Sequence, residues 1–297
     1  MRRTLDCLSH LSLAAILGAA CPPCLAVTAG ATSARGAADD SRESLMHEAF
    51  ADWDGHRPHV MAVPAQDGKG GLTTIATTPA LVVAVDATHR VLVVRGTPSD
   101  EDGNEFAAHV QAGNLGAYWF ALRDGRWVVS ARRDSLAWSG FSGDVGDVEL
   151  FDLGAGHAAI AIDGGSCWQG LCGDWLDVIE FGAERARIVL SRLQVDSSSL
   201  QATEHCDEFL RGAHDLPAAT LGGLTPGNCF DIDAHWRVQP RSGSTRGDIV
   251  VDYSGHDLTR KSATGAPAVR DVAGSLVLRF DGARYVPVRG RNPAHPI

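Results

Sequence analysis

Four cysteines in the body of the chain are the side chains whose spacing bears most directly on chemistry. Cys167 and Cys172 lie in the glycine- and tryptophan-rich stretch Gly164–Trp175, and Cys206 and Cys229 follow later in the chain. An even number of cysteines in an exported chain usually forms disulfides. We expect the pairs Cys167–Cys172 and Cys206–Cys229, because each closes one local segment, although the two other pairings stay open. The second pair would close a loop of about 24 residues and stabilise the fold by roughly 3 kcal/mol.

The segment around Cys167 also resembles the motif of papain-type cysteine proteases, in which a tryptophan follows the nucleophile. Gly165–Trp168 carries this resemblance. Ala161 stands where that family has a glutamine, and glycines follow where its long helix begins, so we favour the disulfide. A zinc site is disfavoured as well, because the CxxC pair of the sequence, Cys21 and Cys24, lies in the N-terminal segment.

Sequence patterns that mark the common enzyme classes are missing. The chain has no GxSxG, HExxH, P-loop or GxGxxG motif. We therefore expect a protein without enzyme activity. The alternative is an exported hydrolase with acidic catalytic residues, which spacing cannot single out because such pairs are recognised by the distance between their carboxylates.

A second candidate site lies in Ala51–Val60. This segment resembles an FG-GAP repeat, the calcium-loop element of integrin-type β-propeller blades, and Asp52, Asp54 and Gly55 carry the resemblance. A weaker match in Glu149–Ala158 keeps the order of strand, aspartate, glycine turn and strand. The resemblance implies a propeller-like fold more than it implies a function.

His56 and His59 stand where an FG-GAP loop has further aspartates, which leaves few oxygen ligands for calcium. One interpretation is a histidine-assisted site for a divalent transition metal, built from Asp52, Asp54, His56 and His59. The favoured alternative is an ordinary turn before a strand, because Asp and Gly dominate turns. We therefore expect no cofactor, and a divalent metal is the open alternative.

Aromatic side chains form a third candidate site. Trp138, Phe141, Trp168 and Trp175 would suit a carbohydrate, a peptide or an envelope protein if they are exposed beside a cleft. The favoured alternative is that they fill the core, because aromatic residues are common inside β-sheets.

The elements that must position these residues are short strands. Tyr118–Leu122 and Trp127–Ser130 flank Asp124-Gly125, which predicts a type I′ hairpin. Phe230–Val238 alternates apolar and polar residues, as a strand with one buried and one solvent-exposed face does. About a dozen such runs, without βαβ alternation, predict an all-β protein of antiparallel sheets, propeller-like or sandwich, with one or two short helices.

Two short helices are expected, over Arg42–Ala51 and within Ser198–Arg211. Residues 27–40 are rich in small residues without periodicity and predict a disordered leader. We expect residues 41–297 to form a single all-β domain, with a two-part organisation near residue 145 as the alternative.

Residues 1–26 have the three parts of a signal peptide. Arg2 and Arg3 provide the positive start, and Leu8–Ala20 provides a short apolar core before small residues. We therefore expect a periplasmic or secreted protein. A lipid anchor at Cys21 is the less favoured alternative, because the residue three positions earlier is not a bulky aliphatic.

Charge and hydropathy narrow the classes of partner. Nucleic-acid-binding proteins carry a basic surface patch, whereas this chain has a formal net charge of −10, so we expect no nucleic-acid partner. No apolar run reaches the roughly 20 residues that a membrane span needs. The sequence thus predicts an exported, disulfide-stapled β protein, a non-catalytic binding or envelope-associated module whose partner it does not identify.

Overall fold

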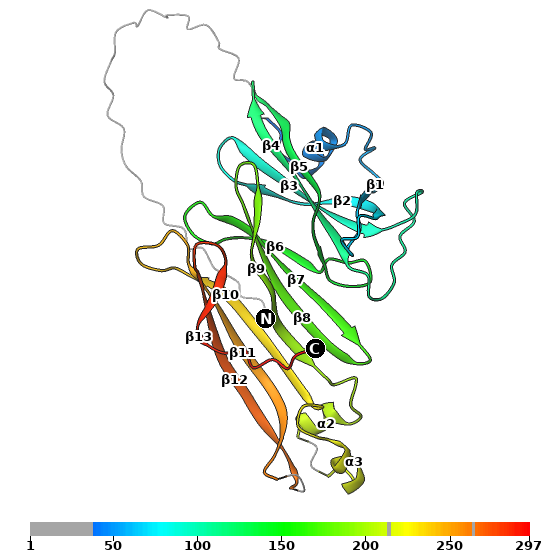
Figure 1. Cartoon of the computed structure of the whole chain (residues 1–297), viewed down its shortest axis with the longest axis vertical. Helices are drawn as coiled ribbons and strands as arrows, with labels where there is room; N and C mark the ends of the chain where they lie inside the picture. The colour runs from blue at the N-terminus through cyan, green and yellow to red at the C-terminus, as the bar shows by residue number, and fades with distance from the viewer. Residues whose placement is uncertain (1–37, 213–214, 263–264) are drawn as a thin grey trace, which may run out of the picture. The chain divides into compact units, whose positions relative to one another are not determined.

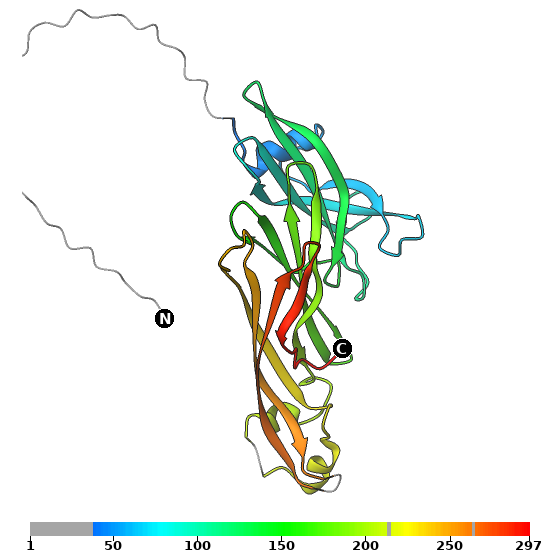
Figure 2. The same ribbon diagram turned by 60° about the vertical axis from the view of Figure 1, so that its left-hand side comes forward.

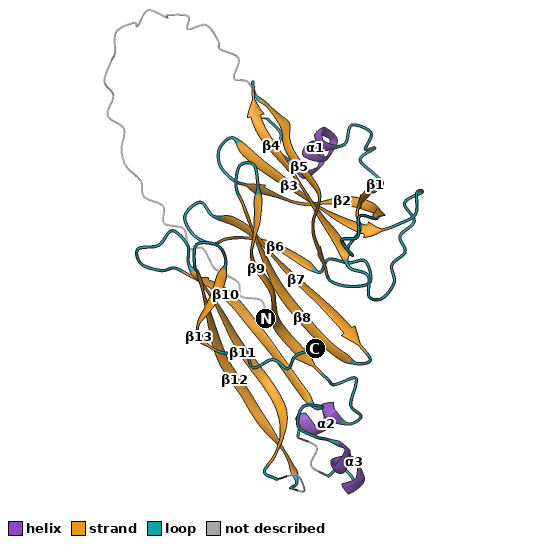
Figure 3. Ribbon diagram, in the orientation of Figure 1, coloured by secondary structure: helices purple, strands orange, loops and turns teal. Residues whose placement is uncertain are grey.

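The structure is a computed structural model that describes residues 38–212, 215–262 and 265–297 (Figure 1). Within these ranges the chain forms two antiparallel sheets and three short helices (Figure 3). None of these helices has the length and apolar composition needed to cross a membrane. The predicted signal peptide and nearly all of the predicted leader lie outside the described residues.

The first sheet contains five strands arranged in their sequence order. They are β1 (His59–Pro64), β2 (Leu72–Ala84), β3 (His89–Pro98), β4 (Gly113–Arg123) and β5 (Arg126–Ser139). The second sheet contains eight strands, again in sequence order. They are β6 (Asp147–Asp152), β7 (Ala158–Trp168), β8 (Leu171–Phe181), β9 (Ala186–Ser198), β10 (Phe230–Gln239), β11 (Asp248–Arg260), β12 (Pro267–Phe280) and β13 (Tyr285–Gly290).

Both sheets are meanders in which each strand pairs antiparallel with the next strand along the chain (Figure 2). The turn between β4 and β5 has positive φ at Asp124 (50°) and Gly125 (79°), as a type I′ turn requires. The all-β antiparallel class and this hairpin are therefore confirmed. The change from one sheet to the other falls between Ser139 and Asp147.

The helices number three in the described part of the chain, one more than the upper prediction. α1 (Arg42–Ala49) begins at Ser41, whose hydroxyl accepts from the Ser44 N–H, and it buries Leu45 and Met46. α2 (Cys206–Leu210) and α3 (Ala218–Gly223) both lie in the long segment between β9 and β10. α3 was not predicted, because its glycine-rich sequence carries neither a capping signal nor the ordinary helix periodicity.

Apolar side chains from both sheets share one core. Val91, Val93 and Trp119 from the first sheet pack with Ile160 and Ile179 from the second. The buried indole Nε1–H of Trp119 donates to the Gly182 carbonyl at 3.0 Å, so the large ring leaves no unpaired donor. A second core lies within the eight-stranded sheet, and a third packs α1 against the five-stranded sheet.

Both predicted disulfides are present. Cys167 and Cys172 lie directly opposite each other on β7 and β8, close to the hairpin turn. Cys206 and Cys229 are fully buried and connect the start of α2 to the residue before β10. The second bond therefore anchors the long β9–β10 segment against the sheet, as expected from its spacing.

Candidate functional site

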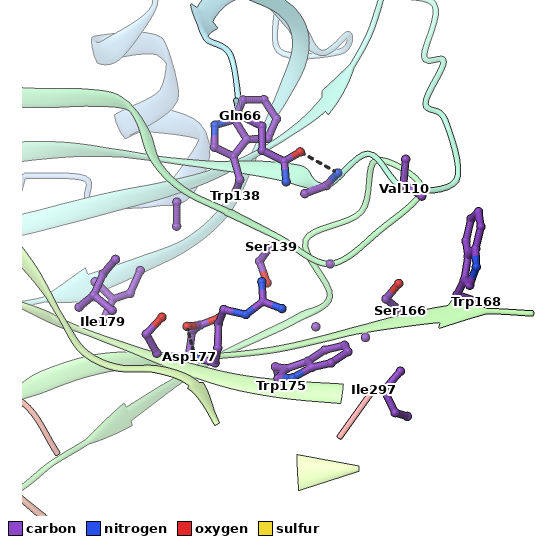
Figure 4. Close-up of a pocket in the computed structure, with 18 residues that line it drawn as sticks. Gln66, Val110, Trp138, Ser139, Ser166, Trp168, Trp175, Asp177, Ile179 and Ile297 are labelled. Atoms are coloured by element: carbon purple, nitrogen blue, oxygen red, sulfur yellow. Dashed lines mark hydrogen bonds between the residues drawn. The ribbon is translucent and has the colours of Figure 1, made fainter. Parts of the chain in front are cut away.

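The main candidate site is a groove of about 500 Å³ that collects three of the predicted tryptophans (Figure 4). Trp138 comes from the end of β5, Trp168 from the tip of β7, and Trp175 from β8. We call this cavity the tryptophan groove. Its remaining lining residues are Gln66, Val110, Ala112, Ala137, Ser139, Gly140, Gly164, Gly165, Ser166, Asp177, Ile179, Ile188, Ser191, Arg192 and Ile297.

The disulfide hairpin presents Trp168 at one end of the groove. Its side chain is 57% exposed, although it follows directly on a disulfide-bonded cysteine. The turn beyond it has positive φ at Gln169 (51°) and Gly170 (84°). A Cβ at Gly170 would lie 2.4 Å from backbone atoms of residues 201 and 202, so only glycine lets the turn pack there. The disulfide and the turn together hold the exposed Trp168 ring on a short hairpin.

Trp175 is held from one side by Arg192. The Arg192 guanidinium carbon lies 5.5 Å from the centroid of the Trp175 ring, within the range of a cation–π contact. Register shifts between β8 and β9 accompany this arrangement, and Arg192 itself has a positive φ of 51°. The backbone N–H of Arg192 donates to Oδ1 of Asp177 at 2.8 Å, which fixes the irregular backbone.

His109 connects the β3–β4 loop to the hairpin, a role for which the sequence carries no signal. Its Nε2 lies 2.6 Å from the Cys167 carbonyl oxygen, so Nε2 carries the hydrogen and donates it. The His109 ring also packs edge-on against Phe141 at 5.4 Å and lies 6.4 Å from Trp168. Phe141 therefore supports the wall behind His109 and does not line the groove with the three tryptophans.

Glycines form part of the floor of the groove. A Cβ at Gly164 would lie 2.6 Å from the Ser139 hydroxyl oxygen, and a Cβ at Gly165 would overlap the Asp174 carboxylate. Two consecutive glycines inside a strand often mark the close approach of another backbone or of a ligand. The sequence carries this signal within the segment that predicts the disulfide loop.

Apolar and polar groups both face the groove. Val110, Trp168, Ile188 and Ile297 are among the most exposed large apolar side chains of the described residues, and all four line it. Charged side chains are few in the lining: Asp177 and Arg192. In the described ranges the Arg192 guanidinium makes no ion pair. The groove thus offers flat apolar faces together with hydroxyl, amide, carboxylate and guanidinium groups.

The aromatic residues divide between the two predicted roles. Tyr118, Trp119, Phe120 and Trp127 are buried and fill cores. Trp168 is exposed, and Trp138, Phe141 and Trp175 are half-buried. Core filling therefore describes the aromatic residues of the β4–β5 hairpin near its turn. The aromatic residues at its far end and on the disulfide-bonded β7–β8 hairpin are half-buried or exposed.

Three of the candidate metal residues, Asp52, Asp54 and His56, lie in the loop between α1 and β1, and His59 is the first residue of β1. Asp54 accepts hydrogen bonds from the backbone N–H groups of His56 and Arg57, both at 2.8 Å, and these bonds lower the pKa of its carboxyl group. His59 Nδ1 lies 3.7 Å from Oδ1 of Asp52. Among the described residues, no group of three or more His, Cys, Asp or Glu side chains is arranged to hold a metal ion. A metal at Asp52, Asp54, His56 and His59 stays a prediction.

A cluster of carboxylates lies on β7, β8 and β9. Asp174 and Asp196 are directly opposite each other in the register of β8 and β9, an unfavourable position for two like charges. Burial, followed by the charges of Asp174 and Asp233, raises the pKa of Asp196 to about 7. Burial and neighbouring acids also raise the pKa of Asp163, to about 6. The alternative of a hydrolase with acidic catalytic residues stays a prediction, and the direct consequence of this cluster concerns stability.

The protein should be more stable at pH 5 than at pH 8. The folded state holds the Asp196 proton up to about pH 7, whereas the unfolded chain releases it near pH 4, so stability falls as pH rises between these values. Asp196→Asn should remove most of this slope and stabilise the protein by about 1 kcal/mol at pH 8, a value reduced by solvent screening. Urea unfolding at both pH values measures it. The exposed Asp215→Asn is the control, and an unchanged slope in Asp196→Asn would contradict the assignment.

Comparison with known proteins gives no family for this chain: no protein-family model, no curated protein and no solved structure matches it. The resemblance of Ala51–Val60 to an FG-GAP repeat therefore stays a prediction.

Proposed function

We propose that this chain is an exported, non-catalytic β protein that binds a carbohydrate chain in the tryptophan groove. The observation that carries the proposal is that Trp138, Trp168 and Trp175, which come from three different strands, line one cavity. Binding sites for small ligands combine apolar and aromatic walls with a few polar groups that fix orientation. The tryptophan groove has this composition.

Carbohydrate suits the groove better than a purely apolar ligand. A sugar ring has one face of C–H groups that packs on an indole, and its rim of hydroxyls needs hydrogen-bond partners. The hydroxyls of Ser139, Ser166 and Ser191, the amide of Gln66 and the carboxylate of Asp177 supply such partners within the lining. An extended sugar chain could contact Trp168 at the rim and Trp175 on the floor at once.

Export is consistent with the two disulfides, which form and persist in oxidising compartments. A rigid sheet that carries a stapled loop is a common way to present a recognition surface. The carbohydrate would then belong to the cell envelope or to the surroundings of the cell.

Substitution of the groove tryptophans tests the proposal. Wild-type protein is applied to an array of glucose, mannose, N-acetylglucosamine and uronic acid oligomers, and the affinity for the best oligomer is measured by calorimetry. Trp168→Ala and Trp175→Ala should each weaken binding about 10- to 100-fold, because truncation of an aromatic anchor costs roughly 1–3 kcal/mol. Leu72→Ala, an exposed apolar residue outside the groove, should leave it unchanged.

Two results would count against this function. Retention of none of the arrayed glycans by the wild-type protein would rule out the ligand class. Equal affinity of wild type, Trp168→Ala and Trp175→Ala for a retained glycan would place the site elsewhere.

A further inference from the structure

A second cavity, of about 470 Å³, lies among β10–β13 and brings three arginines around one aspartate. Arg241 belongs to the β10–β11 turn, Arg279 to β12 and Arg289 to β13, and the aspartate is Asp248 at the start of β11. We call it the arginine pocket. Gln239, Pro240, Ser242, Val277 and Val288 complete its lining, so it shares no residue with the tryptophan groove.

Strand register explains why the arginines meet. Arg289 is the cross-strand partner of Val277, and Arg279 lies two residues beyond Val277 on the same strand. Because side chains alternate along a strand and partners share a face, Arg279 and Arg289 project from the same side of the sheet. The β10–β11 turn then adds Arg241 at the end of the neighbouring hairpin.

Asp248 is hydrogen-bonded to one of the three arginines, Arg279. Its carboxylate receives two hydrogen bonds from Arg279, from Nε at 3.1 Å and from Nη2 at 2.7 Å, the side-by-side geometry of a strong pair. Arg241 Nε lies 3.8 Å from Oδ1 of Asp248, too far for a hydrogen bond. That Nε is buried and has no hydrogen-bond partner. Arg289 makes no ion pair within the described part of the chain.

The pocket therefore carries three positive charges against one negative charge, in a protein whose formal net charge is −10. Among the described residues only Arg279 is hydrogen-bonded to Asp248, whereas Arg241 has only the 3.8 Å contact with it. The excess positive charge is therefore available to a second anion in the cavity.

We propose that the arginine pocket binds a phosphate group. Its excess of two positive charges matches a phosphate dianion, whereas a carboxylate would need only one arginine. Guanidinium groups bind phosphate oxygens through pairs of parallel N–H bonds. The Ser242 hydroxyl and the Gln239 amide are further donors in the lining, and Val277 and Val288 form an apolar wall. The phosphate is either free in solution or carried by a lipid headgroup.

Calorimetry with inorganic phosphate tests the site, with sodium chloride at matched ionic strength as the reference. Wild-type protein should bind phosphate, and Arg241→Gln with Arg289→Gln in one chain should weaken binding at least 10-fold. Arg279 is left in place because it holds the buried Asp248 carboxylate. Arg126→Gln, on the β4–β5 hairpin outside the pocket, is the matched control and should bind as wild type does.

A flotation assay with phosphatidic acid vesicles, whose headgroup is a phosphomonoester, and with phosphatidylcholine vesicles identifies the source of the phosphate. Binding to phosphatidic acid vesicles but not to phosphatidylcholine vesicles, in addition to phosphate binding and lost in the double variant, supports the proposal and assigns a lipid headgroup. Phosphate binding without vesicle binding supports it and assigns a soluble phosphate. Heat signals for phosphate that are equal in wild type and double variant, or no signal in either, would overturn the proposal, and thermal unfolding of both proteins checks that the variant is folded.

Discussion

Glu180→Gln is expected to destabilise the protein by about 3 kcal/mol, which corresponds to a fall in Tm of roughly 6–12 °C. The Glu180 side chain is 9% exposed and is contacted by two guanidinium groups and one imidazole. Arg246 Nη2 lies 2.6 Å and His157 Nδ1 2.7 Å from Oε1, and Arg187 Nη2 lies 2.9 Å from Oε2. Glutamine keeps the shape but removes the charge, so it leaves partly buried arginines without their anion.

These contacts join four elements of the eight-stranded sheet, which is why the expected loss is large. Glu180 is on β8, Arg187 on β9, His157 in the β6–β7 turn and Arg246 in the β10–β11 turn. Burial alone would raise the pKa of Glu180, but hydrogen bonds from Arg187 and Arg246 outweigh it and lower the pKa. The contribution is therefore present above the ordinary glutamate pKa and is lost as pH falls below about 4.

Urea unfolding of Glu180→Gln against wild type measures the effect. Glu184→Gln is the matched control, because Glu184 is exposed in the nearby β8–β9 turn and makes none of these contacts. Equal unfolding free energies of wild type and Glu180→Gln at pH 7 would show that the cluster is replaceable by neutral hydrogen bonds.

Removal of the buried disulfide by Cys206→Ala with Cys229→Ala should cost about 3 kcal/mol. The bond spans a sequence separation of 23 residues, and it lies in a small core with Phe209, Leu224 and Leu258. Without it, the unfolded chain gains the freedom of a long loop. Cys167→Ala with Cys172→Ala should cost less, because that bond spans only 5 residues of a hairpin whose strands already pair.

Chemical unfolding of the two double variants measures this difference, and limited proteolysis localises it. Cleavage should appear first in residues 199–229 when the buried bond is absent. Mass spectrometry of the non-reduced protein provides the control for the pairing. Linkage of Cys206 to Cys167 or Cys172, or a smaller loss of stability in the Cys206/Cys229 variant than in the other, would contradict this account.

Local sequence rules predicted the strands well where turns and alternation agree. Asp124-Gly125 accepts positive φ at both positions, so the β4–β5 hairpin could be predicted from two residues. The strict alternation of Phe230–Val238 likewise matches β10. The strand expected after the turn in Ala51–Val60 is β1. The first half of β2 was not predicted, because the Thr-rich segment before Pro79 lacks clean alternation, and the register shifts between Pro79 and Leu81.

The candidate site could be predicted only in part. Trp168 and Trp175 were singled out because they lie in the segment that holds a cysteine pair, and Trp138 because aromatic residues cluster before it. Neither His109 nor Arg192 was predicted, since a lone histidine in a loop and a lone arginine in a strand carry no pattern. Their roles depend on contacts with Cys167 and Trp175 across large sequence separations.

The sequence by itself determined the all-β class and favoured the pairing of the four cysteines, because alternation, turn residues and loop closure are local properties of the chain. Only the tertiary structure decided which aromatic rings fill the core and which line a cavity, and that three arginines surround Asp248. Those outcomes depend on which strands become neighbours and on which face each register places a side chain. A shift of one residue would reverse every face, so spacing along the chain cannot fix them.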